Sequence, residues 1–263
     1  LPIFRSVRGT RKIYTIAHCM GSVALASGML DGTIPVDWIK GLSCSQVFMN
    51  PQWARINMAK VMMPFDLTRA YRMLGGNWFS CSSSEDDTLV QRSIDQLLRF
   101  YPVEPREMCN NVACHRTSFV FGRCWNHANL NVATHAQTHR FFGGVNMSLE
   151  HLLMSMGEHG HVTTNFPLAQ KLTTPTNLRR LKGLPIFLFS GADNHVLQPA
   201  STLTTYETLR NMFGGEDYER VVIEGYGHLD CWMGTRAERD VFPIIAERVE
   251  RVCRGKGGRE LVV

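Results

Sequence analysis

The sequence predicts a protein of the α/β class, with a parallel sheet between helices and a large helical insertion. Residues 13–16 form a β-branched run that stops at small residues, and residues 23–30 follow with a helical pattern. Residues 37–48 are then typical of a second strand, which completes one right-handed βαβ unit and indicates a parallel sheet. A continuously apolar run at 184–190 is typical of a strand buried on both faces. The pattern between these two parts, from about 50 to 182, is mostly helical.

The composition places the chain among globular proteins and excludes two classes of partner. It has 263 residues, of which 44% are hydrophobic and 19% charged, which is enough to bury a sizeable core. The formal charge of +5 is small, and the basic residues are dispersed without interleaved aromatics, so we expect no nucleic-acid partner. No apolar run reaches the length of a membrane span, and no signal peptide precedes the first strand. The sequence does not assign a compartment.

The turn after the first strand has the layout of a nucleophile elbow. Ala17, Cys19 and Gly21 take the places of the small residues and nucleophile in the pattern G-x-S-x-G, between a strand and a helix. Small flanking residues are expected because the turn is too sharp for larger side chains. Cys19 would then lie at the N-terminus of a helix, whose dipole favours a thiolate. A buried cysteine in an ordinary βα turn is the alternative.

The remaining elements follow from periodicity. Apolar spacing predicts helices in the insertion and, after it, an alternation of strand and helix. The expected helices of the insertion are 52–63, 67–74, 86–100, 118–126, 133–142 and 149–158. The later elements are a helix at 202–213, a strand at 219–223 and a closing helix at 236–251. We therefore assign 1–48 and 183–263 to the core and 49–182 to a helical lid.

Two further residues complete a candidate catalytic constellation. Asp193 follows the strand at 184–190, and His228 follows the strand at 219–223. Nucleophile, acid and base in this chain order, each after a strand, are the arrangement of α/β-hydrolases. Asn194 lies at the position that the acid takes in many of these enzymes, so it is a pocket candidate. Asp230 and Glu224 remain alternatives to Asp193.

The chemistry needs these residue types in these roles. His228 would accept the proton of the Cys19 thiol and later return it to the leaving group, and Asp193 would orient the imidazole ring. The backbone N–H of Met20 would donate to the oxyanion. His18 is expected to line the pocket rather than to serve as a second base.

Several motifs resemble one branch of the α/β-hydrolases. Ala-His-Cys-Met-Gly-Ser at 17–22, Gly-Ala-Asp-Asn at 191–194 and Gly-Tyr-Gly-His-Leu-Asp-Cys at 225–231 are similar to the hydrolase-like domain at the C-terminus of some cholesterol-oxidase-like flavoproteins of the GMC type. Segments 98–102, 109–121 and 135–142 resemble the lid of that branch, and Tyr-Gly-His-Leu-Asp also resembles acid lipases and sterol esterases. The resemblance implies Cys19 as nucleophile and His228 as base. No flavin fingerprint is present, so no cofactor is expected.

The cysteines do not predict a metal centre. Cys109 and Cys114 are close enough for a local disulfide or a shared metal, but the other six cysteines are scattered and no CxxC pair exists. His135 and His139 are spaced to lie on one helix face, without an evident third ligand. We therefore expect no metal, and no disulfide framework.

Two functions of different classes follow from these observations. The first is hydrolysis of an ester or thioester of an apolar, lipid-, sterol- or polyketide-like substrate through Cys19, His228 and Asp193. The second is a weakly active or inactive hydrolase-like module that binds a lipid or docks on a partner domain. The fold normally places several strands and an oxyanion loop before the elbow. We therefore expect a missing N-terminal segment or a partner chain to complete the sheet.

Overall fold

A computed structural model of the chain describes residues 12–61, 67–83, 87–100, 104–165 and 167–254. Its centre is a four-stranded parallel sheet with the strand order β1-β2-β5-β6, formed by β1 (Ile13–His18), β2 (Ile39–Ser45), β5 (Ile186–Gly191) and β6 (Tyr218–Ile223). The expected parallel α/β arrangement is confirmed. Strand β1, which leads into the elbow, lies at one edge of the described sheet.

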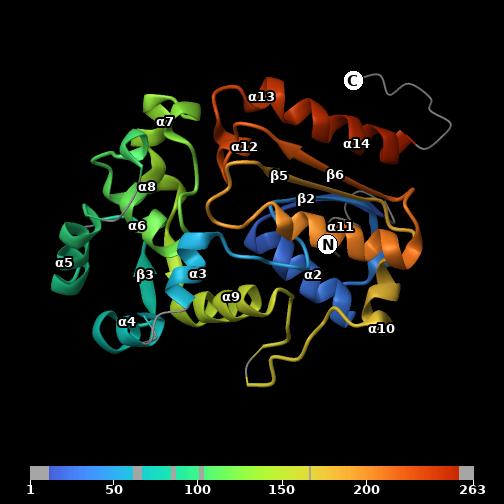
Figure 1. Cartoon of the computed structure of the whole chain (residues 1–263), viewed down its shortest axis with the longest axis horizontal. Coiled ribbons are helices and arrows are strands. Elements are labelled where there is room, and N and C mark those ends of the chain that lie inside the picture. The colour runs from blue at the N-terminus through green and yellow to red at the C-terminus, as the bar shows by residue number, and fades with distance from the viewer. Residues whose placement is uncertain (1–11, 62–66, 84–86, 101–103, 166, 255–263) are drawn as a thin grey trace.

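Helices cover both faces of the sheet because successive strand residues point to opposite sides. In β5, Ile186 and Leu188 pack with the helices α2 (Met20–Asp31) and α11 (Ala200–Phe213), while Phe187 and Phe189 pack with α14 (Phe242–Arg254). Strand β5 is buried at every residue, as expected for a strand covered on both faces. Figure 1 shows α14 and α11 on the two sides of the sheet.

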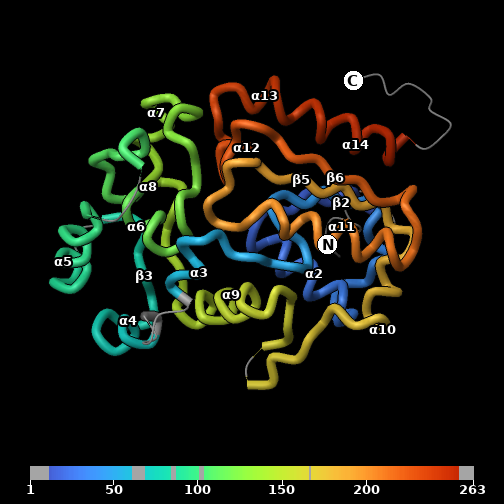
Figure 2. The backbone as a smooth tube through the Cα atoms, viewed as in Figure 1, coloured from blue at the N-terminus to red at the C-terminus, as the bar shows by residue number. Residues whose placement is uncertain are grey.

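The segment between β2 and β5 adds a mainly helical layer beside the sheet. Its helices are α3 (Arg55–Val61), α4 (Leu67–Gly75), α5 (Leu89–Leu98), α6 (Val112–Phe121), α7 (Val132–Ala136), α8 (Thr138–Phe141), α9 (Met147–His159) and α10 (Pro175–Leu178). The short strands β3 (Trp78–Ser80) and β4 (Gly144–Asn146) form an antiparallel pair that the sequence did not predict. Most of this layer lies at one end of the core in the tube view (Figure 2).

The remaining elements are short. They are the 3₁₀ turns η1 (Val36–Trp38), η2 (Pro105–Glu107), η3 (His127–Asn129) and η4 (Arg179–Leu181), and the helices α12 (Asp230–Met233) and α13 (Ala237–Asp240). No helix among the described residues combines the length and the apolar character needed to cross a membrane.

One predicted helix of the insertion was wrong. The helix expected at 118–126 is α6, which runs from Val112 to Phe121. The side chain of Asn111 caps its first turn by accepting the backbone N–H of Ala113 and of Cys114, and Gly122, with φ of 90°, ends it. These cap signals were present in the sequence and outweigh the apolar run on which the prediction relied. Residues 122–126 therefore form a loop that is free to approach the core.

Helices α4, α9 and α11 cover the predicted ranges 67–74, 149–158 and 202–213 and extend beyond them, whereas other predicted helices are shorter or divided. The expected helix at 86–100 is α5, which begins after a capping box formed by Thr88 and Gln91, while part of its predicted range lies outside the described residues. The helix expected at 133–142 is broken into α7 and α8 at Gln137, and the one expected at 236–251 into α13 and α14 at Val241. Residues 62–66 and 101–103, where parts of other predictions fall, also lie outside the described residues.

Candidate active site

Cys19 lies in the strained turn that the elbow motif predicts. Its φ of 49° and ψ of −122° are uncommon for any residue other than glycine, and α2 begins at the next residue. The backbone N–H of Cys19 donates to the carbonyl of Ser45 at the end of β2, which ties the turn to the sheet. A Cβ added at Gly21 would meet no described atom within 4 Å, so the expected steric need for a small residue is not seen at that position.

The fold brings two histidines to the thiol of Cys19. The Sγ of Cys19 and one ring nitrogen each of His18 and His228 all lie within 4.8 Å of one another. The two imidazole rings are 4.9 Å apart between centroids and tilted by 60°. His228 is buried, and it comes from the loop after β6, as the chain order predicted. The nucleophile and base candidates therefore meet at the carboxyl ends of two strands.

Asn194 fixes the imidazole of His228. The Nδ1 atom of His228 lies 3.2 Å from Oδ1 of Asn194, and this oxygen also accepts the backbone N–H of Val196 at 2.9 Å and of Leu197 at 3.1 Å. Because an amide oxygen carries no hydrogen, Nδ1 of His228 is the donor. The lone pair is then on Nε2, which is the tautomer that a general base for a thiol requires.

Asp193, the acid predicted from the sequence, does not contact His228 in the structure. Its side chain is exposed, and Oδ2 accepts a hydrogen bond of 3.3 Å from Nδ2 of Asn126. The turn after β5 directs residue 194 inward and residue 193 outward, because the backbone N–H of Asp193 donates to the carbonyl of Tyr226. The placement of the orienting residue is therefore corrected from Asp193 to Asn194.

Asp230 and Glu224, the two alternatives to Asp193, do not take the role of orienting the imidazole of His228. The carboxylate of Asp230 is buried and accepts the backbone N–H of Gly227 at 2.9 Å and Nδ2 of Asn129 at 2.5 Å. It therefore holds the loop that carries His228 rather than the imidazole itself. Glu224 is exposed.

Gln46 is a structural support of the site that the sequence analysis missed. Its side chain is completely buried at the end of β2, in the left-handed region with φ of 74°. Its Oε1 accepts Nδ2 of Asn194 at 2.8 Å, and its Nε2 donates to the carbonyl of His228 at 2.8 Å. One amide thus joins the loops after β5 and β6. The signal in the sequence was a single amide within the otherwise largely apolar run at 41–49.

Gly191 lets these two loops approach each other. A Cβ at this position would lie 2.2 Å from the carbonyl oxygens of both Tyr226 and Gly227. Only glycine allows the backbone after β5 to pass so close to the loop of His228. The spacing between Asn194 and His228 therefore depends on this residue.

His18 is held in one tautomer beside Cys19. The indole Nε1 of Trp232 donates to Nδ1 of His18 at 2.9 Å, and Oγ of Ser45 lies 2.6 Å from the same nitrogen. Since an indole nitrogen can only donate, Nδ1 accepts and Nε2 carries the hydrogen. This Nε2 is buried and has no hydrogen-bond partner among the described residues. Burial also lowers the pKa of His18 to about 4, which keeps its ring neutral at pH 7.

Burial shifts the pKa values of the thiol and the base in opposite directions. It raises the pKa of Cys19 to about 12, although the backbone N–H of Met20 opposes the shift. It lowers the pKa of His228 well below its usual value, with a smaller contribution from His18. The expectation that the helix dipole makes Cys19 a thiolate is therefore corrected, because desolvation outweighs the effect of the helix N-terminus. The resting pair is a neutral thiol beside a neutral imidazole.

Alkylation of Cys19 is expected to be slow at neutral pH and to accelerate well into the alkaline range. A thiol with a pKa near 12 has a thiolate fraction at pH 7 about three orders of magnitude below that of an ordinary thiol. Iodoacetamide labelling of the Cys19 peptide, followed by mass spectrometry from pH 7 to 11, measures this, with glutathione as the reference thiol. A labelling rate that levels off near pH 7 would contradict the expected shift.

The insertion docks on the loops that carry Asn194 and His228. Nδ2 of Asn126 donates to Asp193 and to the carbonyl of Gly225, and Nδ2 of Asn129 donates to Gly225 and Asp230. The backbone N–H of Leu229, next to His228, donates to the carbonyl of Cys124 at 2.7 Å. We call residues 124–129 the docking segment. It is part of the support of the site.

Two ionisable residues of the insertion, Glu150 and Lys60, interact electrostatically, and Glu150 lies close enough to affect the thiol. Burial raises the pKa of Glu150 on α9 to about 7, with Lys60 opposing the shift, and Glu150 itself contributes to the raised pKa of Cys19. Burial also lowers the pKa of Lys60 to about 8. Neither residue was identified from the sequence, because nothing in its local pattern distinguishes a buried carboxyl from an exposed one.

The folded chain is similar to solved structures of lipases and esterases. It matches a lipase in its open form with a TM-score of 0.53 and 13% identity, over 97% of this chain and 71% of that chain. It matches a highly thermostable carboxyl esterase from Bacillus coagulans, in complex with glycerol, with a TM-score of 0.51 and 12% identity, over 94% of this chain and 68% of that chain. No protein-family model and no curated protein sequence matches it. The chain therefore has the α/β-hydrolase fold, as predicted.

Proposed function

We propose that the protein hydrolyses esters or thioesters of apolar acids through a triad of Cys19, His228 and Asn194. The observation that carries the proposal is the hydrogen bond from His228 Nδ1 to Asn194 Oδ1. This bond leaves the lone pair of the buried His228 on Nε2, close to the thiol of Cys19 in the strained turn of the elbow. A triad of cysteine, histidine and asparagine is a recurring variant of the serine triad. The lipases and esterases of the same fold are consistent with this reaction class.

The reaction proceeds in two acyl transfers. Nε2 of His228 takes the thiol proton as Sγ of Cys19 attacks the carbonyl carbon, and the leaving alcohol or thiol departs with that proton. Water then attacks the thioester carbon, loses a proton to His228, and the acid is released as Sγ recovers a proton. The backbone N–H of Met20 donates to the oxyanion in both steps. His18, whose Nε2–H has no partner in the part of the chain that the structure describes, is the candidate for a second donor.

An apolar acyl group fits the surroundings of the thiol. Cys19 packs against the main core cluster, in which Trp53 and Met156 of the insertion take part and against which Met58 and Phe121 also pack. Methionine and aromatic side chains adapt to irregular apolar groups. The insertion also exposes large apolar side chains, among them Leu74, Leu97 and Phe100, at 70–86% of their full accessible area.

A second candidate function is a binding module without turnover. The raised pKa of Cys19 favours it, because a thiol with a pKa near 12 is a poor nucleophile until a base removes its proton. In this case an apolar ligand would bind beside Cys19 without being cleaved. Thiol reactivity does not separate the two functions, since both predict an unreactive resting thiol, whereas turnover does.

The test is a series of p-nitrophenyl esters and acyl thioesters with chains from acetyl to palmitoyl. We expect hydrolysis that depends on Cys19 and that is more efficient, as kcat/KM, for chains longer than acetyl, because apolar groups surround the thiol. Binding of a fatty acid without hydrolysis of any member of the series would support the module instead.

Replacing Asn194 is expected to reduce turnover, whereas replacing Asp193 is not. In Asn194→Ala the imidazole of His228 loses the acceptor that fixes its tautomer and orientation, so kcat should fall by about a hundredfold. Asp193→Ala removes a side chain that contacts Asn126 and not His228, so kcat should stay close to that of the wild type. Steady-state kinetics on one ester compares the two. A large loss in Asp193→Ala alone would return the role to Asp193.

A further inference from the structure

We infer that the insertion holds a structural zinc ion, bound by Cys109, Cys114, His127 and His135. One ligand atom from each of these four residues lies within 4.8 Å of the other three. Two thiols and two imidazoles are a ligand set that zinc binds in closed, four-coordinate sites. The sequence predicted no metal, because His135 is spaced to pair with His139 and no local pattern indicates the loop that brings His127 to the two cysteines.

Two distances within the group match the edges of a zinc tetrahedron. With Zn–N near 2.0 Å and Zn–S near 2.3 Å, neighbouring ligand atoms of a tetrahedral site lie roughly 3.3 to 3.8 Å apart. Nε2 of His127 is 3.2 Å from Nε2 of His135 and 3.5 Å from Sγ of Cys114. A hydrogen bond between the two rings explains only the first distance. A central ion explains why all four atoms converge.

Glu107 prepares His127 for this role. Its buried carboxylate accepts Nδ1 of His127 at 2.6 Å and the backbone N–H of the same residue at 3.0 Å. The hydrogen of the neutral ring is therefore on Nδ1, and the Nε2 lone pair points to the cluster. A carboxylate behind a ligating histidine is a common second partner in zinc sites, where it fixes the ring and makes it a stronger ligand.

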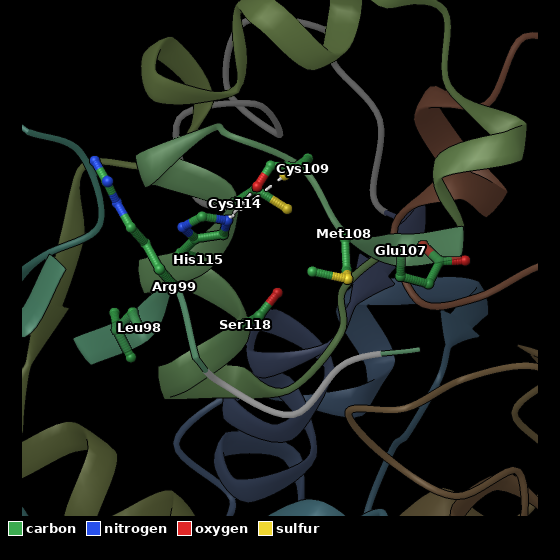
Figure 3. Close-up of a pocket in the computed structure, with 8 residues that line it drawn as sticks. All are labelled: Leu98, Arg99, Glu107, Met108, Cys109, Cys114, His115 and Ser118. Atoms are coloured by element: carbon green, nitrogen blue, oxygen red, sulfur yellow. Dashed lines mark hydrogen bonds between the residues drawn. The ribbon is translucent and has the colours of Figure 1, made fainter. Parts of the chain in front are cut away.

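The backbone around the four ligands is fixed by two other side chains. Nε2 of His115 donates to the carbonyl of Cys109 at 2.7 Å, and Figure 3 shows this contact beside Cys114 on the wall of a small cavity. Nδ2 of Asn111 donates to the carbonyl of His135 at 2.7 Å, while its Oδ1 caps the helix that carries Cys114. Asn111 thus connects the cysteine pair to the histidine pair.

A disulfide is the competing use of the two cysteines. All eight cysteines of the chain are free thiols in the structure. In a disulfide between Cys109 and Cys114, neither sulfur could bind a metal as a thiolate. The imidazoles of His127 and His135 would then lie beside the sulfurs without a metal to bind. The four residues between Cys109 and Cys114 and the twelve between Cys114 and His127 match the spacings of zinc-binding motifs, whereas the seven between His127 and His135 exceed them.

The zinc site has a consequence for the site of Cys19 and His228, and this consequence rests on the proposed function. His127 belongs to the docking segment, in which Cys124, Asn126 and Asn129 bind the loops of Asp193 and His228. A zinc ion on His127 therefore fixes the segment that supports the general base. Metal content can be measured without any substrate, so failure of the zinc site and failure of the proposed activity are distinguishable.

Metal analysis of the full chain tests the site directly. Protein purified under reducing conditions from zinc-supplemented medium is expected to hold about one zinc per chain, as a closed structural site does. Cys114→Ser and His135→Ala should lose it. The matched controls are Cys81→Ser, another buried cysteine of the insertion, and His139→Ala, an exposed histidine near His135, and both should retain it. Cys19→Ser should also retain the metal, which separates this site from the group of His18, Cys19 and His228.

Cobalt gives a reading on the unmodified chain, so the test does not depend on the variants folding. After removal of zinc by a chelator, Co²⁺ should produce the thiolate charge-transfer and visible bands of a tetrahedral sulfur site. The inference would be overturned if the protein contained no zinc and cobalt produced no such bands. It would also be overturned if Cys114→Ser and His135→Ala retained the metal, or if Cys19→Ser lost it. A disulfide between Cys109 and Cys114 in peptide mapping would overturn it as well.

Removing the carboxylate behind His127 is expected to weaken the site without removing a ligand. Glu107→Gln keeps a similar shape but loses the charge that accepts Nδ1–H, so the zinc dissociation constant should rise by roughly tenfold to a hundredfold. Competition with a chromophoric chelator measures the constant. Glu104→Gln, which changes an exposed carboxylate that pairs with Arg106, is the control and should leave it unchanged. Equal constants for all three proteins would contradict the role of Glu107.

Discussion

Cys19→Ala is expected to lower kcat/KM for ester hydrolysis by at least about 10⁴-fold, because the acyl group then has no nucleophile to receive it. His228→Ala should cost a similar factor, and the double variant should be hardly worse than either single variant, since the two residues act as a unit. Steady-state kinetics on one p-nitrophenyl ester gives all three values. Rapid quenching of the wild type should reveal an acyl group on the Cys19 peptide by mass spectrometry.

The serine variant is the matched control for the nucleophile. Cys19→Ser keeps the shape of the elbow, and a neutral imidazole must remove a proton from the hydroxyl as it would from the half-buried thiol. Residual turnover above that of Cys19→Ala would therefore show that the elbow and base are intact. Unchanged turnover in both variants would rule out Cys19 as the nucleophile.

Arg116→Met is expected to destabilise the insertion by about 3–5 kcal/mol, because it leaves buried carboxylates without their partner. The side chain of Arg116 is 1% exposed, and its guanidinium contacts Asp95 at 2.6 Å and Asp87 at 2.7 Å. It also donates to the carbonyls of Ser80 and Ser82. Urea denaturation followed by tryptophan fluorescence measures the loss.

An exposed arginine of the same region provides the comparison. Arg106 pairs with Glu104 at 2.8 Å, but its side chain is 74% exposed, so Arg106→Met should cost less than about 1 kcal/mol. Adding Asp87→Asn and Asp95→Asn to Arg116→Met should recover part of the loss, because the unpaired charges are then removed. Equal destabilisation by Arg106→Met and Arg116→Met would contradict this explanation.

The parts of the fold that depend on local pattern were predictable from the sequence. A β-branched run before small residues gave β1 and the turn of Cys19, and an apolar run gave β5. The helix α6 was misplaced because apolar periodicity was given more weight than the caps Asn111 and Gly122. The pair of β3 and β4 was missed because strands of three residues are too short to show alternation.

The candidate site was predictable as a set of loops but not as a set of contacts. The order of Cys19 and His228 along the chain placed both correctly at the ends of parallel strands. The choice between Asp193 and Asn194 depends on the direction of one turn, which chain order does not encode. Gln46 joins loops that lie 145 and 182 residues further along the chain, so no local pattern indicates it. The resemblance to the hydrolase-like domain of cholesterol-oxidase-like flavoproteins stays a prediction.

The line of side chains behind Cys19 has an electrostatic consequence. His228, Asn194 and Gln46 are joined by hydrogen bonds, and burial keeps His228 and the thiol uncharged at neutral pH. An aspartate in place of Asn194 would put a permanent negative charge in this buried place, at a continuous cost to the folded state. With amides alone, the resting site carries no net charge, and under the proposed mechanism opposite charges would exist there only while an acyl group is being transferred.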